Sequence, residues 1–157
     1  MDLKSFFPYR LAVLAEQVSR SMAEVYAERF GITRDEWRVL AALASLADGR
    51  GIRTSQVIED TTLEKMQVSR AVARLEERGA LARERDPEDL RGQLLSLRPA
   101  GRRLLAQIVP LVKAREAYLL EALSAQERRA LESAMDKMLQ RALSSEASAK
   151  LRGRSAV

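Results

Sequence analysis

Residues 63–79, LEKMQVSRAVARLEERG, have the periodicity of an amphipathic helix with two chemically unequal faces. Apolar side chains that repeat every three and four positions predict a face packed on a core. That stripe comprises Val68, Ala71, Val72 and Leu75. The other face carries cations and hydrogen-bond donors. The segment therefore predicts a helix that packs by one side and offers the other to a partner.

A predicted β-hairpin follows this helix directly. The short runs at 80–85 and 93–98 bracket the polar stretch DPEDLRG, in which Pro87 and Gly92 favour a turn. A short helix over about 55–60 and a tight turn precede the amphipathic helix. A short helix, a turn, a second helix and a hairpin are the parts of a helix-turn-helix with a wing.

Longer helical patterns flank this central segment. Residues 8–30 and 99–145 are predicted to be helical, and capping boxes at TRDE (33–36) and SAQE (124–127) start new helices. These flanking helices carry more apolar side chains than one winged helix can bury. Their surplus faces favour burial in a dimer interface.

The chain of 157 residues fits one domain, 1–157, with the winged lobe at 33–98. Residues 146–157 form a basic tail with little to bury, and we expect it to be disordered. We see neither a signal peptide nor an apolar run long enough to span a membrane. We therefore expect a cytoplasmic protein that does not bind membranes.

The chain contains no cysteine and no histidine. This composition excludes thiolate metal sites, thiol redox sensing and the most common general base. No Gly-rich phosphate loop is present either. We therefore expect no enzymatic activity, no metal site and no cofactor.

The net charge of +5 is unevenly distributed. Residues 50–103 carry twelve cations against nine anions, and the last eleven residues carry three cations and no anion. An excess on the segment with the helix-turn-helix points to nucleic acid as the partner. A solubilising surface is the alternative that charge alone leaves open.

The sequence resembles the MarR (multiple antibiotic resistance regulator) family of winged-helix transcription factors. TSQVIEDTTLEKMQVSRAVARLEERGAL, from residue 54, is similar to the family's second and third DNA-proximal helices, and RERDPEDLRGQLLSLRPAG, from residue 83, is similar to its wing. FGITRDEWRVLAAL, at 30–43, is similar to the entry into the family's second helix. The resemblance implies a mainly α fold with a small β-hairpin, and long N- and C-terminal dimerisation helices.

Within this resemblance, the recognition helix would enter the major groove of double-stranded DNA. Gln67 would pair with adenine, Arg70 or Lys65 with guanine or a phosphate, and Met66 would touch a thymine methyl group. The family's minor-groove residue corresponds to Arg91, which Asp89 would hold in place. The alternatives are an ordinary surface helix and an exposed hairpin ion pair. The full set of expected DNA contacts is Thr54, Ser55, Gln56, Lys65, Met66, Gln67, Ser69, Arg70, Arg74, Asp89 and Arg91.

Two of these expected contacts have a structural alternative, and three further arginines near them are candidates for DNA contacts. Thr54 and Ser55 fit N-caps of the short helix as well as phosphate contacts. Arg53 is a further candidate for a phosphate contact. For Arg83 and Arg85, pairing with neighbouring charges on the strand is the alternative to contacting DNA.

The family's effector pocket lies between the DNA-binding lobe and the dimerisation helices. Large side chains for such a pocket, together with arginines for an anionic ligand, are Arg20, Met22, Tyr26, Trp37, Arg38, Arg115 and Tyr118. Aromatic residues at helical spacing are also ordinary core residues, which is the alternative for each of them.

We therefore interpret the chain as a sequence-specific DNA-binding transcriptional regulator. The expectation is a homodimeric repressor of a pseudo-palindromic operator, modulated by a small aromatic or phenolic anion. Two alternatives remain: a winged-helix dimer that binds a protein partner without specific DNA binding, and a small helical enzyme. Loss of Arg70 and Arg91 without loss of the cellular role would favour the first alternative, and turnover of a ligand the second.

Overall fold

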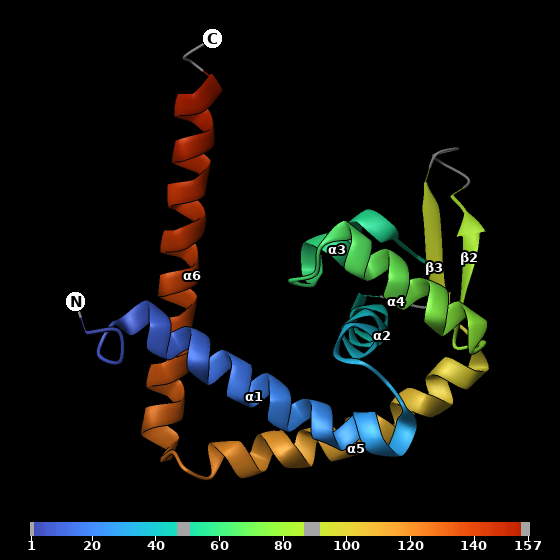
Figure 1. The fold of residues 1–157 in the computed structure, drawn as a ribbon, viewed down its shortest axis with the longest axis horizontal. Coiled ribbons are helices and arrows are strands. Elements are labelled where there is room, and N and C mark those ends of the chain that lie inside the picture. Colours follow the sequence, from blue (N-terminus) through green and yellow to red (C-terminus); the bar gives the residue numbers. More distant parts are fainter. Residues whose placement is uncertain (1, 47–50, 87–91, 155–157) are drawn as a thin grey trace. The chain divides into compact units, whose positions relative to one another are not determined.

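The computed structural model describes residues 2–46, 51–86 and 92–154, which form helices and one small sheet. The helices are α1 (Phe7–Phe30), α2 (Arg34–Leu46), α3 (Thr54–Asp60), α4 (Lys65–Glu77), α5 (Pro99–Leu120) and α6 (Ala125–Arg154). The strands are β1 (Ile52–Arg53), β2 (Leu81–Arg85) and β3 (Gln93–Leu97). The mainly α winged-helix fold predicted from the sequence is confirmed (Figure 1).

The chain divides into two compact units, Met1–Glu116 and Ala117–Val157. The first unit contains the helix-turn-helix, the sheet, α1 and most of α5. The second contains the last residues of α5 and all of α6. Within the described ranges, no helix is both long and apolar enough to cross a membrane.

The core of the first unit lies between α2, α3, α4 and the sheet. The stripe predicted on α4 is buried, and it packs with Val39, Leu40 and Leu43 of α2. Figure 1 shows α3 and α4 beside the hairpin, with α2 next to them. Because the apolar stripe of α4 faces this core, its polar face points outward.

The hairpin is confirmed, and the short extended piece that the sequence predicts at Ile52–Arg53 joins it as a third strand. β3 pairs antiparallel with β2, in a register that puts Leu95 opposite Arg83. The two residues of β1 also pair with β3, with Ile52 opposite Leu95, so the order is β1-β3-β2. This third strand ties the start of α3 to the base of the wing.

Gly101 allows the start of α5 to approach the start of β2 closely. A Cβ atom placed on Gly101 would lie 2.1 Å from the carbonyl oxygen of Ala80. That same carbonyl accepts a hydrogen bond of 2.9 Å from the backbone N–H of Arg98. Only a residue without a side chain fits where the helix approaches this strand so closely.

Both predicted capping boxes form. The Thr33 N–H donates to Glu36 Oε2 at 2.7 Å, and the Glu36 N–H donates to Thr33 Oγ1 at 3.2 Å. At the start of α6, Ser124 and Glu127 exchange the equivalent bonds, at 2.8 and 3.3 Å. The bonds to Ser124 hold the pKa of the Glu127 carboxyl below its ordinary value.

The disordered tail expected from residue 146 stays a prediction, although most of that segment is drawn as helix here. Helix α6 continues without a break to Arg154. The reason is local, since Ala147, Ala149, Lys150 and Leu151 all have high helix propensity and can extend an existing helix at little cost.

Large apolar side chains of α1 and α6 remain exposed within this single chain. On and just before α1 they are Phe6, Phe7, Tyr9, Leu11, Val13 and Leu14; on α6 they are Leu131, Met135, Met138, Leu139 and Leu143. Helices with several large exposed apolar side chains are typical of protein–protein interfaces.

Candidate nucleic-acid interface

The outward face of α4 carries the predicted recognition residues. Met66 is 61% exposed, at the second position of the helix. The other predicted contacts on this helix are also exposed: Lys65, Gln67, Ser69, Arg70 and Arg74. The helix therefore presents cations, donors and one apolar side chain on a single surface, as reading base edges and phosphates requires.

A groove of about 560 Å³ lies between the first turns of α3 and α4 and the β2–β3 hairpin. Its lining includes three cations, three hydroxyl groups and the apolar side chains of Ile58 and Val72. The lining residues are Arg53, Thr54, Ser55, Ile58, Lys65, Ser69, Val72, Arg83, Gly92 and Gln93. This composition suits an anionic group such as a phosphate, and it joins four of the predicted contacts, Thr54, Ser55, Lys65 and Ser69, in one site.

Arg83 belongs to this groove, although the sequence left its role open between DNA and its strand neighbours. The partner of Arg83 is Glu76 of α4, and Arg83 Nε lies 2.9 Å from Glu76 Oε2. The contact is an ion pair rather than an aligned hydrogen bond. The strand register explains the contact, since the opposite residue, Leu95, is buried and this side of the sheet packs on α4.

Arg53 lies at the same groove and contacts the base of the wing. Its Nε donates to Asp86 Oδ2 at 2.5 Å, and the Asp86 side chain is only 3% exposed. The Asp86 N–H in turn donates to the carbonyl of Gly92 at 3.1 Å. A nearly buried carboxylate thus directs an arginine of β1 toward the groove.

The side chain of Gln67 caps the start of α4. Its Oε1 accepts a hydrogen bond of 2.9 Å from the backbone N–H of Glu64, which satisfies one of the free donors before α4. Bidentate pairing with adenine uses this same oxygen. For the adenine contact predicted for Gln67, this oxygen must either accept a second hydrogen bond or release the Glu64 N–H.

Thr54 and Ser55 do not cap α3. The N-cap is Arg53, whose backbone is extended and which forms no side-chain cap bond. Thr54 is half-buried, whereas Ser55 and Gln56 are exposed on the first turn of the helix. The predicted wing residues Asp89 and Arg91 lie outside the described residues.

Among the residues predicted for a ligand pocket, Tyr26 and Trp37 form a pair. Their ring centroids are 5.4 Å apart and their planes differ by 23°, so they stack. Tyr26 is 1% exposed, and this burial raises the pKa of its hydroxyl above the ordinary value of 10.0. Met22 is partly buried beside the same core. The alternative reading of these residues as core is thus supported in this conformation.

The predicted arginine partners of a ligand have different surroundings. Arg38 Nη1 donates to Thr62 Oγ1 at 2.8 Å, in the turn between α3 and α4. Arg115 Nη1 donates to Ser21 Oγ at 3.3 Å and lies 4.0 Å from Glu24. Arg20 is exposed on α1, and Tyr118, which is 66% exposed, belongs to the second unit. In the described ranges, acidic side chains do not gather into a group of three or more that would hold a metal ion.

Comparison with known proteins agrees with this geometry. A model of the MarR family matches residues 30–92, which contain α2, α3, α4 and the hairpin up to the start of β3. The chain is 30% identical over 108 residues to Transcriptional regulator HosA of Escherichia coli O111:H-. That alignment covers 69% of this chain and 78% of the relative.

Solved structures share the fold over nearly the whole chain. A MarR/EmrR family transcriptional regulator from Acinetobacter sp. ADP1 matches with a TM-score of 0.80 at 24% identity, covering 90% of this chain and 98% of that one. BpsR from Bordetella bronchiseptica, whose DNA binding is regulated by 6-hydroxynicotinic acid, matches with a TM-score of 0.78 at 23% identity. That match covers 88% of this chain and 96% of BpsR.

Proposed function

Because this chain belongs to the MarR family of transcriptional regulators, we propose that it is a homodimeric repressor that binds a pseudo-palindromic operator. The observation that carries the proposal is the continuous cationic and hydroxyl-bearing surface formed by α4 and the groove beside it. A two-fold axis would place two such surfaces on one side of the dimer. Their half-sites would lie about 10 base pairs apart, one turn of the duplex.

Phosphate and base contacts would divide along this surface. Lys65 lines the groove and would neutralise a phosphate. Arg53 and Arg83 line it as well, and because they already pair with Asp86 and Glu76 they would contribute hydrogen-bond donors to phosphate oxygens. Met66 and Arg70 are exposed on α4, so they would reach a thymine methyl group and a guanine edge, respectively. The wing residue Arg91 would enter the adjacent minor groove, held by Asp89.

Dimerisation would bury the apolar side chains that α1 and α6 leave exposed. A residue such as Leu139, which is 60% exposed, is costly to leave in water. Homodimers with a two-fold axis are the most common oligomers, and a two-fold axis matches a palindromic site.

A small aromatic anion would regulate the DNA affinity. DNA binding of the relative BpsR is regulated by 6-hydroxynicotinic acid, which has this chemistry. In this chain Trp37, which is only partly buried, and the adjacent Arg38 offer an aromatic ring and a cation. Such a ligand would act by binding one dimer geometry more tightly than another.

The test is a fluorescence-anisotropy titration of the protein against the intergenic DNA upstream of its own gene, with a scrambled duplex alongside. We expect selective binding whose affinity falls steeply with salt. Arg70→Ala should weaken binding to the intergenic duplex at least tenfold and reduce its preference over the scrambled duplex. Arg103→Ala, an exposed arginine on α5, removes the same charge elsewhere and should have little effect.

Absence of any DNA binding at low salt by a folded dimer would contradict the proposal. It would instead favour a winged-helix module that binds a protein partner. If Arg70→Ala and Arg103→Ala weakened DNA binding equally, Arg70 would contribute only nonspecific charge.

A further inference from the structure

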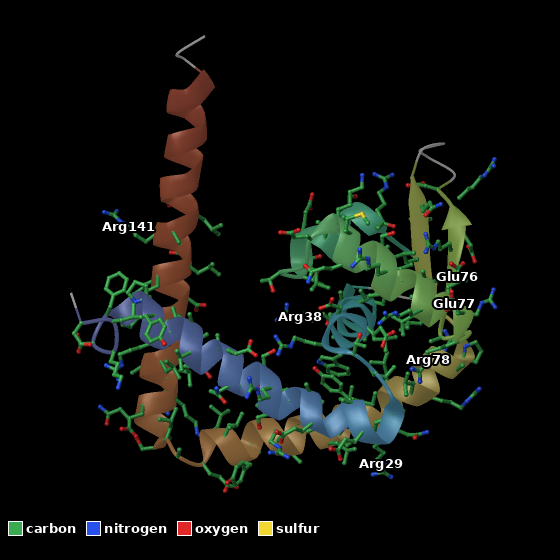
Figure 2. The ribbon with its side chains drawn as sticks, in the orientation of Figure 1. Arg29, Arg38, Glu76, Glu77, Arg78 and Arg141 are labelled. Atoms are coloured by element: carbon green, nitrogen blue, oxygen red, sulfur yellow. The ribbon has the colours of Figure 1, made fainter. Side chains whose placement is uncertain are left out.

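Arg78 joins the end of the recognition helix to the end of α1. Its Nη1 donates to the carbonyl of Gly31 and its Nη2 to the carbonyl of Phe30, each at 2.7 Å. The partners are 47 and 48 residues away in the sequence. Figure 2 shows Arg78 at the end of α4 that lies beside the end of α1.

The two carbonyls are available because of how α1 ends. Gly31 has a φ of 60°, in the left-handed region that favours glycine, and it ends the helix. The N–H groups of Gly31 and Ile32 bond back to Ala27 and Tyr26. The carbonyls of Phe30 and Gly31 thus lie at the negative end of the helix dipole, where a cation is favoured.

The position of Arg78 is fixed by the end of α4. Arg78 is the C-cap residue of α4, and its N–H donates to the carbonyl of Arg74 at 3.1 Å. A guanidinium that makes two bonds from one planar fork resists rotation more than a single bond does. The contact therefore restrains the orientation of α4 relative to α1 as well as their separation.

We propose that Arg78 is a positioning residue that sets the angle of the recognition helix relative to α1, and hence the separation of the two recognition helices in the dimer. This inference rests on the proposed function. Arg78 lies at the opposite end of α4 from Lys65 and Met66, so it acts through the helix.

The length of α4 makes this angle important for DNA binding. At about 1.5 Å per residue, its 13 residues span about 20 Å. A tilt of about 10° at the Arg78 end would displace the Lys65 end by about 3 Å, close to the rise of about 3.4 Å per base pair. Loosening this contact should therefore change which half-site spacings the dimer accepts.

The experiment is selection from a pool of random duplex DNA by the wild-type dimer and by Arg78→Ala. We expect the wild type to enrich two half-sites at one fixed spacing. The variant should enrich the same bases within each half-site but over a broader range of spacings. Its affinity for the best wild-type duplex should fall about tenfold, which corresponds to about 1.4 kcal/mol, because a misplaced recognition helix loses base contacts.

Arg29→Ala is the matched control. Arg29 lies at the same end of α1, with its guanidinium carbon 5.5 Å from the centroid of the Phe30 ring, on the side away from α4 (Figure 2). This variant removes the same charge from the same region without touching the two hydrogen bonds. It should retain the wild-type spacing.

Arg78→Lys keeps the charge but replaces the two-armed fork by a single ammonium group. Its spacing range should lie between those of the wild type and Arg78→Ala, and it provides the test if Arg78→Ala does not fold by circular dichroism. Wild-type spacing and affinity in the folded Arg78 variants would overturn the inference. Failure of the wild type to enrich any sequence would instead contradict the proposed function, on which the inference depends.

Discussion

At the scale of single residues, Gln67 has two uses for one oxygen atom. In the structure Oε1 caps α4 by accepting from the Glu64 N–H, while reading an adenine would use that same atom. The two roles can be separated because capping needs only an acceptor, whereas base reading also needs the amide donor.

We predict that Gln67→Glu keeps the stability of the wild type but binds the upstream duplex at least tenfold more weakly. A carboxylate still accepts the Glu64 N–H and is favoured near a helix N-terminus, but it has no donor and repels phosphate. Urea unfolding and anisotropy titration measure the two effects. Gln67→Ala should lose both, with a stability cost of about 1 kcal/mol. Unchanged DNA binding by Gln67→Glu would leave Gln67 as a cap alone.

Tyr26 gives a prediction about pH. Burial raises the pKa of its hydroxyl above 10.0, so the unfolded state releases this proton at a lower pH than the folded state. The contribution of neutral Tyr26 to stability is therefore present below pH 10.0 and is lost as the pH rises through the folded-state pKa. Tyr26→Phe should lose less stability than the wild type between about pH 9 and about pH 11, measured by urea unfolding with circular dichroism.

The control is Tyr118→Phe, which removes a tyrosine that is 66% exposed. It should follow the wild-type pH dependence. If Tyr26→Phe lost as much stability at alkaline pH as the wild type does, the pKa of Tyr26 would be the same in the folded and unfolded states.

At the scale of helices and strands, what the sequence predicts depends on how local the interactions are. The Thr33–Glu36 and Ser124–Glu127 capping boxes span three residues, so the sequence alone identifies them. The helix periodicities and the turn of the hairpin are local signals as well. They were sufficient to predict the order of elements.

No local sequence signal identifies the long-range contacts of the site. Arg53 with Asp86, Arg38 with Thr62 and Arg78 with Gly31 are separated by 33, 24 and 47 positions. An arginine can reach many partners, and only the packed fold selects one. The sequence does not identify the partner of Arg83 for the same reason, because Glu76 lies on a different element.

The junction between α5 and β2 gives a prediction at this scale. Gly101→Ala should destabilise the protein by at least about 2 kcal/mol, because its Cβ would lie 2.1 Å from the Ala80 carbonyl oxygen and must push helix and strand apart. Urea unfolding measures this cost. Ala106→Gly, at an exposed position of the same helix, is the control and should cost only about 1 kcal/mol. A Gly101→Ala variant as stable as the wild type would mean that α5 has room to shift.

At the scale of the whole molecule, the charged and apolar surfaces lie on different parts of the chain. The cations of the groove belong to the helix-turn-helix and the hairpin, whereas most of the exposed large apolar side chains in the described ranges lie on α1 and α6. This division suits a protein that binds DNA with one part and its own copy with another.

We predict that Leu139→Asp converts the dimer to a monomer and lowers the affinity for the upstream duplex at least tenfold. A charge in a buried apolar interface is strongly unfavourable, and a monomer holds only one half-site. Analytical ultracentrifugation gives the oligomeric state. Glu132→Ala, an exposed position on the same helix, should remain dimeric. A dimeric Leu139→Asp variant would place the interface elsewhere.

Trp37 is the single tryptophan of the chain, and it stacks on Tyr26 where α1 meets α2. The protein therefore contains an intrinsic optical reporter at one defined place. A stacked neighbouring ring alters both the emission and the lifetime of an indole, so any rearrangement of α1 on α2 should change the fluorescence without an added label. Titrating DNA or a candidate aromatic acid while recording this emission would reveal whether either one disturbs the contact between the two helices.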